Sequence, residues 1–391
     1  MKRARLIAFY LPQFHPTVEN DEWWGRGFTE WTNVTKARPL FPGHYQPHLP
    51  ADLGFYDLRV PESREAQARL ARKAGIEAFC YWHYWFAGRR ILERPFNEVV
   101  ASGSPDFPFC LAWANATWTS HWYGADQRTL IEQTYPGDED HQQHFHAILP
   151  ALRDPRYLRV DGRPLFAIFR PKDLPNPEAF IALWQSLAVK NGLPGIHFVA
   201  HLFDNELDYP WRKIGYGGAV MTNELKLLRR RLWHIAAERL RLAREEENAR
   251  ARLNAHVRQG AEIAKLLSHR ILLRLLRWPR GVHFYRDAML FFKSAKALES
   301  GCYPSIVPGW DNTPRAGYKG IVLQGSTPEL FVDHARDILE SVKPWDAENR
   351  IVFVKSWNEW AEGNYLEPNL RYGHAYLDGL RAIVEATATA D

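Results

Sequence analysis

Residues 351–363 read IVFVKSWNEWAEG. The four apolar residues Ile351–Val354 form the continuous run that is typical of a buried strand. Glu359 and Glu362 follow this run three residues apart, and Gly363 lets the backbone turn away. Two carboxylates beyond the carboxyl end of a buried strand suit acid–base chemistry at a glycosidic bond. The spacing alone also allows both glutamates to cap a following helix or to lie in solvent.

The rest of the chain repeats the pattern of a buried strand followed by a helix. Most strand candidates are continuous apolar runs, as expected for parallel strands that are covered on both faces. Helix-start signals follow several of them, at Pro61, at Asn176-Pro177-Glu178 and at Thr327-Pro328-Glu329. The alternation predicts a single (β/α)₈ TIM barrel over residues 1–391. The eight strand candidates are Arg5–Tyr10, Glu77–Tyr84, Pro108–Trp113, Leu165–Arg170, His197–Leu202, Tyr216–Val220, Pro304–Pro308 and Ile351–Lys355.

Two segments depart from a minimal barrel. The first βα loop, Leu11–Pro61, is long and rich in Trp, His, Pro and Gly, and long loops in compact domains are usually functional. Leu225–Arg280 has the composition of a helical insertion, with 15 Lys and Arg against 5 Glu, whereas the whole chain has a net charge of +5. This basic insertion either docks on an anionic membrane or an acidic glycan carrier, or packs on the barrel as a flap. No nucleic-acid motif accompanies its charge.

Composition points to a globular enzyme with an unusual share of aromatic residues. Aromatic residues make up 14% of the chain and include 16 Trp, whose flat apolar face and N–H donor suit stacking on sugar rings. Cys80, Cys110 and Cys302 fall in apolar runs, which favours buried reduced thiols. The opening MKRARLIAFYLPQF is interpreted as a first strand and not as a signal peptide. We therefore expect a cytoplasmic protein, peripheral at the inner membrane if the insertion docks there.

The residues beyond each strand form a candidate substrate site, because barrel active sites gather at the carboxyl ends of the strands. Their mixture of aromatic rings and planar polar groups suits carbohydrate, although each aromatic taken singly could be a core residue. The predicted substrate-binding residues are Tyr10, Gln13, His15, Glu30, Trp31, Trp82, His83, Tyr84, Trp113, Asn115, Trp118, Arg170, His201, Trp310, Asp311, Arg315, Trp357 and Asn358.

Other chemistries fit the sequence less well. Phosphate-binding GxxxxGK[ST] and GxGxxG motifs are absent, and so is the GxSxG nucleophile elbow. His141, His144 and His146 lie close together, but at the start of a predicted outer helix away from the other candidates, which disfavours a metal site. We therefore expect no metal and no cofactor.

Several long motifs carry a family resemblance. AFYLPQFHPTVENDEWWGRGFTEWTNV at 8–34 resembles the opening motif of the WbsX-like family, which is common in bacterial polysaccharide gene clusters and is related to glycoside hydrolase family 99. The resemblance covers nearly the whole chain except 225–280. It continues through FPGHYQPHLPADLGFYDLR, YWHYWF, VDGRPLF, PGWDNTPR and SWNEWAEGNYLEP.

The resemblance implies a (β/α)₈ barrel and a retaining, endo-acting glycosidase or transglycosidase. Family 99 enzymes act on α-mannosides or mannans, and the substrate expected here is a bacterial polysaccharide or lipid-linked glycan. Carried over from the family, Glu359 is the base that acts on the sugar's own 2-hydroxyl, which forms a 1,2-anhydro sugar. Glu362 is the acid at the leaving oxygen and then the base for water. This acid needs a pKa raised by burial or by its partner's charge.

One motif departs from the family pattern. After Asn115 the family has a glutamate, and further on two basic residues, where this chain has Ala116, Thr117 and Ser120-His121. A carboxylate and positive charge are therefore missing, which indicates an altered subsite. Two alternatives stay open: a glycosyltransferase in surface polysaccharide (O-antigen or capsule) biosynthesis, and a non-catalytic glycan-binding barrel.

The basic insertion yields a first testable prediction. If it docks on membranes, the protein will bind vesicles that contain phosphatidylglycerol in flotation assays, and raising the salt from 0.05 to 0.5 M will weaken this binding because charges are screened. Deletion of 225–280 will abolish it. Equal binding by the deletion variant would contradict the docking interpretation, and vesicles of phosphatidylcholine alone serve as the control.

Overall fold

The protein's structure is a computed structural model that describes residues 3–120, 128–203, 206, 208–222, 279, 281–292 and 299–389. Of the predicted insertion at 225–280, all residues except Pro279 lie outside this described part. The same holds for His121 and for Asp204-Asn205, which follow strand candidates three and five. The division of the chain into one barrel with an inserted segment therefore stays a prediction.

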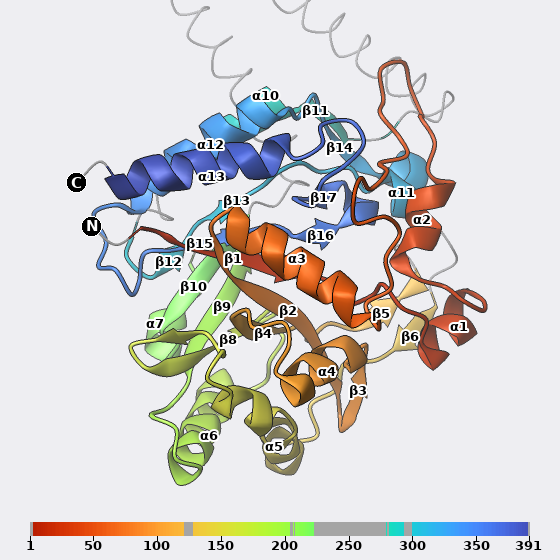
Figure 1. Ribbon diagram of the computed structural model, residues 1–391. Helices are drawn as coiled ribbons and strands as arrows, with labels where there is room; N and C mark the ends of the chain where they lie inside the picture. Colours follow the sequence, from red (N-terminus) through yellow and green to blue (C-terminus); the bar gives the residue numbers. More distant parts are fainter. Residues whose placement is uncertain are drawn as a thin grey trace, which may run out of the picture.

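Eight parallel strands form a closed (β/α)₈ barrel, as the sequence predicted (Figure 1). The seventh position holds two short strands, β12 paired with β10 and β13 paired with β15. Pro304 separates them, and proline has no N–H to donate to a ladder, so the break falls there. The barrel strands are β1 (Arg5–Tyr10), β2 (Ile76–Phe86), β4 (Phe109–Trp113), β8 (Arg163–Ile168), β9 (His197–Phe203), β10 (Gly218–Thr222), β12 (Cys302–Tyr303) with β13 (Ser305–Ile306), and β15 (Ile351–Val354).

Helices surround the barrel, and three begin at the predicted signals. The side chain of Thr327 accepts a hydrogen bond from the N–H of Leu330 and caps α12, whereas Asn176 makes no such bond at the start of α6. In the described part of the link after β9, the one α-helix is the four-residue α7. The outer helices are α3 (Pro61–Lys73), α4 (Arg94–Ser102), α5 (Asp138–Arg153), α6 (Pro177–Lys190), α7 (Trp211–Ile214), α10 (Tyr285–Phe292), α12 (Pro328–Val342) and α13 (Ala375–Thr389).

The first βα loop is long, as predicted, and contains two short helices of its own. In Figure 1, α1 lies beside β5 and β6, whereas α2 lies on the side of the carboxyl-terminal segment and contacts η5. The loop thus reaches the region of the candidate glutamates. The smaller elements are α1 (Val18–Trp24), α2 (Glu30–Lys36), β3 (Arg89–Ile91), β5 (Trp118–Thr119), β6 (Thr129–Ile131), β7 (Arg159–Val160), β11 (Gly281–Phe284), α11 (Thr313–Ala316), η4 (Gly317–Lys319), β14 (Ile321–Gln324), β16 (Asn358–Glu359), η5 (Trp360–Glu362) and β17 (Asn364–Tyr365).

Aromatic rings fill the barrel interior and much of the layer around it. Phe9 stacks on Trp82 at 4.8 Å and on Phe353 at 5.1 Å, so strands one, two and eight meet inside the barrel. The next residue, Tyr10, contacts Phe79 instead, on the outer face of the sheet. This alternation follows from the two-residue period of a strand, and it decides which strand-end residues can face a substrate.

The described residues include the cysteines, the helices and the histidines on which predictions from composition were based. All three cysteines are buried free thiols. In the ranges given above, no helix combines the length and the apolar character needed to cross a membrane. The described His, Cys, Asp and Glu side chains form no group of three or more that could hold a metal ion. His144, one of the three clustered histidines, is buried beside His83 in the outer layer.

The close packing of β10 against β12 predicts that Gly218 cannot be replaced by a larger residue without a loss of stability. A Cβ added to Gly218 of β10 would lie 2.5 Å from Cε2 of Tyr303, a fully buried ring that has no room to move. Gly218→Ala should lower the free energy of unfolding by about 3 kcal/mol in urea denaturation. Gly162→Ala is the matched control: its φ of +76° costs about 1 kcal/mol, but its Cβ meets nothing within 4 Å. Equal losses in both variants would contradict this packing.

Candidate active site

The motif at the end of β15 divides its side chains between the core and the barrel rim. Trp357 and Trp360 are buried; Trp360 stacks on Tyr365 at 3.7 Å. Glu359 and Glu362 remain 13% and 15% exposed. The tryptophans therefore anchor the motif, while the two carboxylates face outward where a substrate can reach them.

A buried carboxylate outside the pair holds this motif in place through hydrogen bonds. Glu367 is buried and accepts hydrogen bonds from the Gln67 amide (2.6 Å), the Tyr56 hydroxyl (2.8 Å) and the Trp360 indole N–H (2.6 Å). Burial raises the pKa of Glu367 to about 7, against the opposing effect of these bonds. Because Trp360 begins the turn of η5, this network holds the backbone that presents Glu362.

One arginine joins three carboxylates at the rim. Arg315 contacts Glu362 through Nη1 (2.7 Å) and Glu359 through Nη2 (3.2 Å). Its Nη2 and Nε lie 2.8 and 2.9 Å from Oε1 of Glu30, which comes from α2 in the first loop. We call these four residues the acidic cluster. Arg315 follows strand seven, Glu359 and Glu362 follow strand eight, and Glu30 lies in the first loop.

The shared guanidinium limits how far apart Glu359 and Glu362 can lie. Adjacent nitrogens of one rigid fork hold their contacting oxygens within about 8 Å of each other, a separation that glycosidic-bond chemistry uses. Glu30 is fully buried, and its Oε2 has no hydrogen-bond partner among the described residues. The cluster therefore has two accessible carboxylates, one buried carboxylate and one positive charge.

Glu359, the first carboxylate of the pair, has a raised pKa. Burial, and after it the charge of Glu362, raises the pKa of Glu359 to about 8, although Arg315 opposes both effects. Burial also raises the pKa of Glu30, against the charge of Arg315. The raised pKa thus belongs to Glu359, the residue to which the family resemblance gives the role of base. At neutral pH the free protein therefore keeps a proton on Glu359 most of the time.

Lys355 is a member of this region that the sequence analysis missed. It is the last residue of the predicted eighth strand, and its charge lowers the pKa of Glu359. Its ammonium lies 4.9 Å from the centre of the Trp310 ring, a cation–π contact that brings the predicted substrate residue Trp310 close to the cluster. A lysine that ends an otherwise apolar strand was the signal that could have identified it.

Beside the cluster, aromatic side chains surround the mouth of the barrel. Trp82 and Phe169 are partly exposed, and their rings meet edge to face at 5.4 Å. Arg170 lies over Phe169 and Phe203, 5.0 Å from each ring centre. His201 bonds to Thr222, and burial holds the pKa of His201 well below its usual range. Trp82 and Arg170 are thus partly exposed, whereas His201 is buried, and substrate contact by these three residues stays a prediction.

Six other predicted substrate residues are buried and have structural roles. The Tyr10 hydroxyl donates to Gln67 at 2.7 Å, and His83 lies 2.8 Å from His144 on α5. Tyr10 and His83 alternate with inward-facing neighbours on their strands, so these two side chains point toward the helices. Substrate contact by the six residues stays a prediction. The six are Tyr10, Trp31, His83, Trp113, Trp357 and Asn358.

Asp311 and Asn115 tie loops together. Asp311 accepts hydrogen bonds from His44 (2.6 Å), Gln46 (2.7 Å) and Thr313 (2.6 Å). Although burial alone would raise it, these contacts hold the pKa of Asp311 below its usual range. Asn115 bonds to both the N–H and the C=O of Arg170 at 2.7 and 2.9 Å, which joins the ends of strands three and four.

The remaining predicted residues lie in the first loop and near β5. Gln13 is buried, and its C=O accepts a hydrogen bond from the N–H of Glu30 at 3.0 Å, which places α2. His15 bonds to the C=O of Pro12, and burial lowers the pKa of His15. Tyr84 and Trp118 meet edge to face at 5.0 Å. The structure therefore does not join these four side chains to the acidic cluster directly.

Comparison with known families identifies the family of the chain. The family model described as "Glycosyltransferase WbsX" matches residues 6–380. The chain belongs to the WbsX family. This WbsX-family chain is 39% identical over 384 residues to "Uncharacterized protein WxcX" from two strains of Xanthomonas campestris pv. campestris. The match covers 97% of this chain and 49% of each relative, so the chain spans about half the length of the curated relatives it matches.

Solved structures support the fold of this WbsX-family chain. A "Glycoside hydrolase-like protein" superimposes with a TM-score of 0.56 at 15% identity, covering 98% of this chain and 94% of its own. The GH99 endo-alpha-mannosidase from Bacteroides thetaiotaomicron gives a TM-score of 0.55 at 15% identity and covers 99% and 98%. At this identity the likeness establishes a shared fold, the glycosidase-like (β/α)₈ barrel.

The acidic cluster predicts strong coupling between Arg315 and Glu30. Arg315→Met leaves a fully buried carboxylate without its cation, which should cost about 3 kcal/mol in urea denaturation at pH 7. Because burial raises the pKa of Glu30, the loss should shrink as the pH falls toward the ordinary range of a glutamate, where the unfolded chain takes up the same proton. Adding Glu30→Gln to Arg315→Met should recover most of the loss, whereas Arg381→Met, an exposed control, should change little. Additive losses for the two substitutions would contradict the coupling.

Proposed function

We propose that this protein is a retaining, endo-acting glycosidase or transglycosidase that acts on a bacterial polysaccharide or a lipid-linked glycan. The observation that carries the proposal is the pair Glu359 and Glu362, both partly exposed and both bound to Arg315 at the barrel mouth. The glycosidase-like barrel and the aromatic mouth around Trp82 support it further.

The proposed reaction begins with participation of the substrate's 2-hydroxyl. The Glu359 carboxylate removes the hydroxyl proton as the oxygen attacks the anomeric carbon, while Glu362 gives its proton to the leaving oxygen. The glycosidic bond breaks and a 1,2-anhydro sugar forms. Glu362 then takes a proton from water or from an acceptor hydroxyl, whose oxygen attacks the anomeric carbon. The bond between the anomeric carbon and O2 of the anhydro ring breaks, and Glu359 returns its proton to O2. Two inversions give net retention.

Glu359 must be ionised to act as the base in this first step. Because burial raises the pKa of Glu359 to about 8, the proton that the free protein holds there must leave before the 2-hydroxyl is attacked. A base with a pKa near neutrality is effective, since it accepts a proton readily once ionised.

The family description favours a second candidate function, transfer of a sugar from an activated donor during surface polysaccharide synthesis. A nucleotide-sugar transferase would need a site for a diphosphate, and such a donor should then bind saturably in calorimetry. A non-catalytic glycan-binding barrel is the remaining alternative, and it predicts glycan binding without turnover by the unaltered protein. A cytoplasmic location, peripheral at the inner membrane, fits a lipid-linked substrate and is part of this proposal.

The acid–base role of Glu362 can be tested by substitution. Glu362→Gln keeps the shape of the side chain but cannot exchange a proton, so release of oligosaccharides from a panel of bacterial polysaccharides and mannans should fall at least ~10³-fold. Glycan binding in calorimetry and the thermal unfolding midpoint should stay near those of the unaltered protein. Glu340→Gln, on the exposed face of α12, is the control. Activity of Glu362→Gln close to the unaltered level would contradict the proposal.

A further inference from the structure

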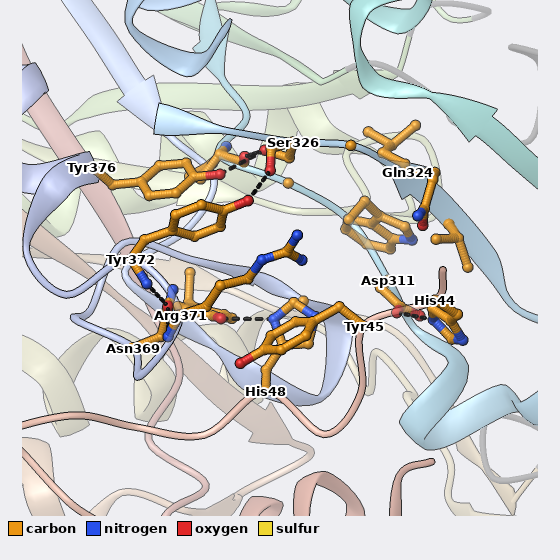
Figure 2. A pocket seen from close by; sticks show the side chains of 18 residues that line it. His44, Tyr45, His48, Asp311, Gln324, Ser326, Asn369, Arg371, Tyr372 and Tyr376 are labelled. Atoms are coloured by element: carbon orange, nitrogen blue, oxygen red, sulfur yellow. Dashed lines mark hydrogen bonds and ion pairs between the residues drawn. The ribbon is translucent and has the colours of Figure 1, made fainter. Parts of the chain in front are cut away.

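A cavity lies beside the segment that carries Glu362 and Gly363. It has a volume of about 90 Å³, room for roughly six water molecules, and lies outside the acidic cluster. The first loop supplies Tyr45 and His48, the segment after β14 supplies Ser326, and the carboxyl-terminal loop supplies Arg371 and Tyr372 (Figure 2). No step of the proposed reaction uses this cavity, which we call the Arg371 pocket.

A single guanidinium dominates the Arg371 pocket. Arg371 lies over the rings of Tyr45 and Tyr372, 4.5 and 5.0 Å from their centres, and Figure 2 shows its head group directed into the middle of the cavity. Cation–π contacts hold the side chain in place without consuming its hydrogen-bond donors. Within the described residues, no carboxylate forms an ion pair with Arg371.

The other polar groups of the pocket leave this positive charge uncompensated. Its one acidic residue, Asp311, is already bound to His44 at 2.6 Å and to Gln46 at 2.7 Å. The buried indole N–H of Trp310, which also lines the cavity, has no acceptor among the residues that the structure describes. The pocket therefore offers hydrogen-bond donors and a cation, and it lacks a free anion to satisfy them.

Charge and shape select the ligand class. A planar guanidinium matches a carboxylate or a phosphate group through two parallel hydrogen bonds. Arg371 is the one guanidinium among the lining residues, and a single positive charge balances a carboxylate better than it balances a diphosphate. Tyrosine rings on both sides of Arg371 offer flat faces to a sugar ring. These features together favour a sugar that carries a single carboxylate.

The pocket adjoins the proposed reaction centre. Gly363 and Asp311 form part of its wall, and the N–H of Asp311 donates to the C=O of Glu362 at 2.6 Å. A Cβ on Gly363 would lie 2.8 Å from the Asp311 nitrogen. The backbone of these two residues alone therefore separates the Arg371 pocket from the acidic cluster at this point. Trp310 joins them as well, because Lys355 of the barrel mouth lies over its ring.

We propose that the Arg371 pocket is a subsite for a uronic acid residue of the glycan, with Arg371 binding the sugar carboxylate and Tyr45 and Tyr372 contacting the ring. The assignment to a glycan rests on the proposed function. The subsite would make the protein selective for acidic polysaccharides by contacts that lie beyond the bond being cleaved.

The test is calorimetry with trigalacturonic acid and with its fully methyl-esterified form, which has the same rings without the charge. The unaltered protein should bind the acid at least tenfold more tightly than the ester. Arg371→Ala should remove that preference, Tyr45→Ala should weaken the binding of both probes, and Arg381→Ala, an exposed control, should bind as the unaltered protein does. Glu362→Gln should also bind normally, since this readout does not depend on turnover.

Several results would overturn the subsite. They are equal binding of acid and ester, unchanged binding by Arg371→Ala, and displacement of trigalacturonic acid by pyrophosphate or uridine diphosphate at lower concentration than by galacturonic acid. The last result would assign the pocket to a phosphate ligand. None of these outcomes bears on Glu362, whereas turnover by Glu362→Gln would refute the proposed reaction and leave the measured binding intact. The two proposals therefore fail separately.

Discussion

The guanidinium of Arg315 is the interaction on which the arrangement of the candidate site depends. Three carboxylates within reach of one another would repel, and one of them is fully buried, so without a cation the cluster would hold extra protons or spread apart. Arg315 contacts all three and stays partly exposed itself. It can therefore keep the paired glutamates close and still give way to a substrate.

The barrel brings these groups together from distant parts of the chain. Arg315 lies 285 residues from Glu30 and 44 from Glu359, yet each ion pair is direct. The link is possible because strands one, eight and seven are neighbours in the closed sheet, so their following loops meet at one rim. Asp311 strengthens the same junction through His44 and Gln46 of the first loop. The fold thus positions the cluster through loops that are anchored to three adjacent strands.

Much of the architecture could be predicted from sequence because buried parallel strands are continuous apolar runs, as in Ile351–Val354. The direction of individual side chains could not, since Tyr10 and His83 differ from inward-facing neighbours by only one residue of register. The role of Arg315 as the centre of the cluster also escaped prediction, because no local pattern encodes a contact across 285 residues. Lys355 was missed for a similar reason: its importance comes from the charge of Glu359, which the linear sequence does not place beside it. The paired glutamates themselves were predictable from spacing and family resemblance together.

The central claim is that Glu359 and Glu362 act on a glycan through the substrate's own 2-hydroxyl. The most direct measurement compares cleavage of an oligosaccharide that the protein hydrolyses with cleavage of its analogue methylated at O2 of the unit that bears the broken bond. The methylated analogue should bind but release no product, because Glu359 has no proton to remove and O2 cannot form the anhydro ring. Release of product from the methylated analogue at a comparable rate would contradict participation of the 2-hydroxyl.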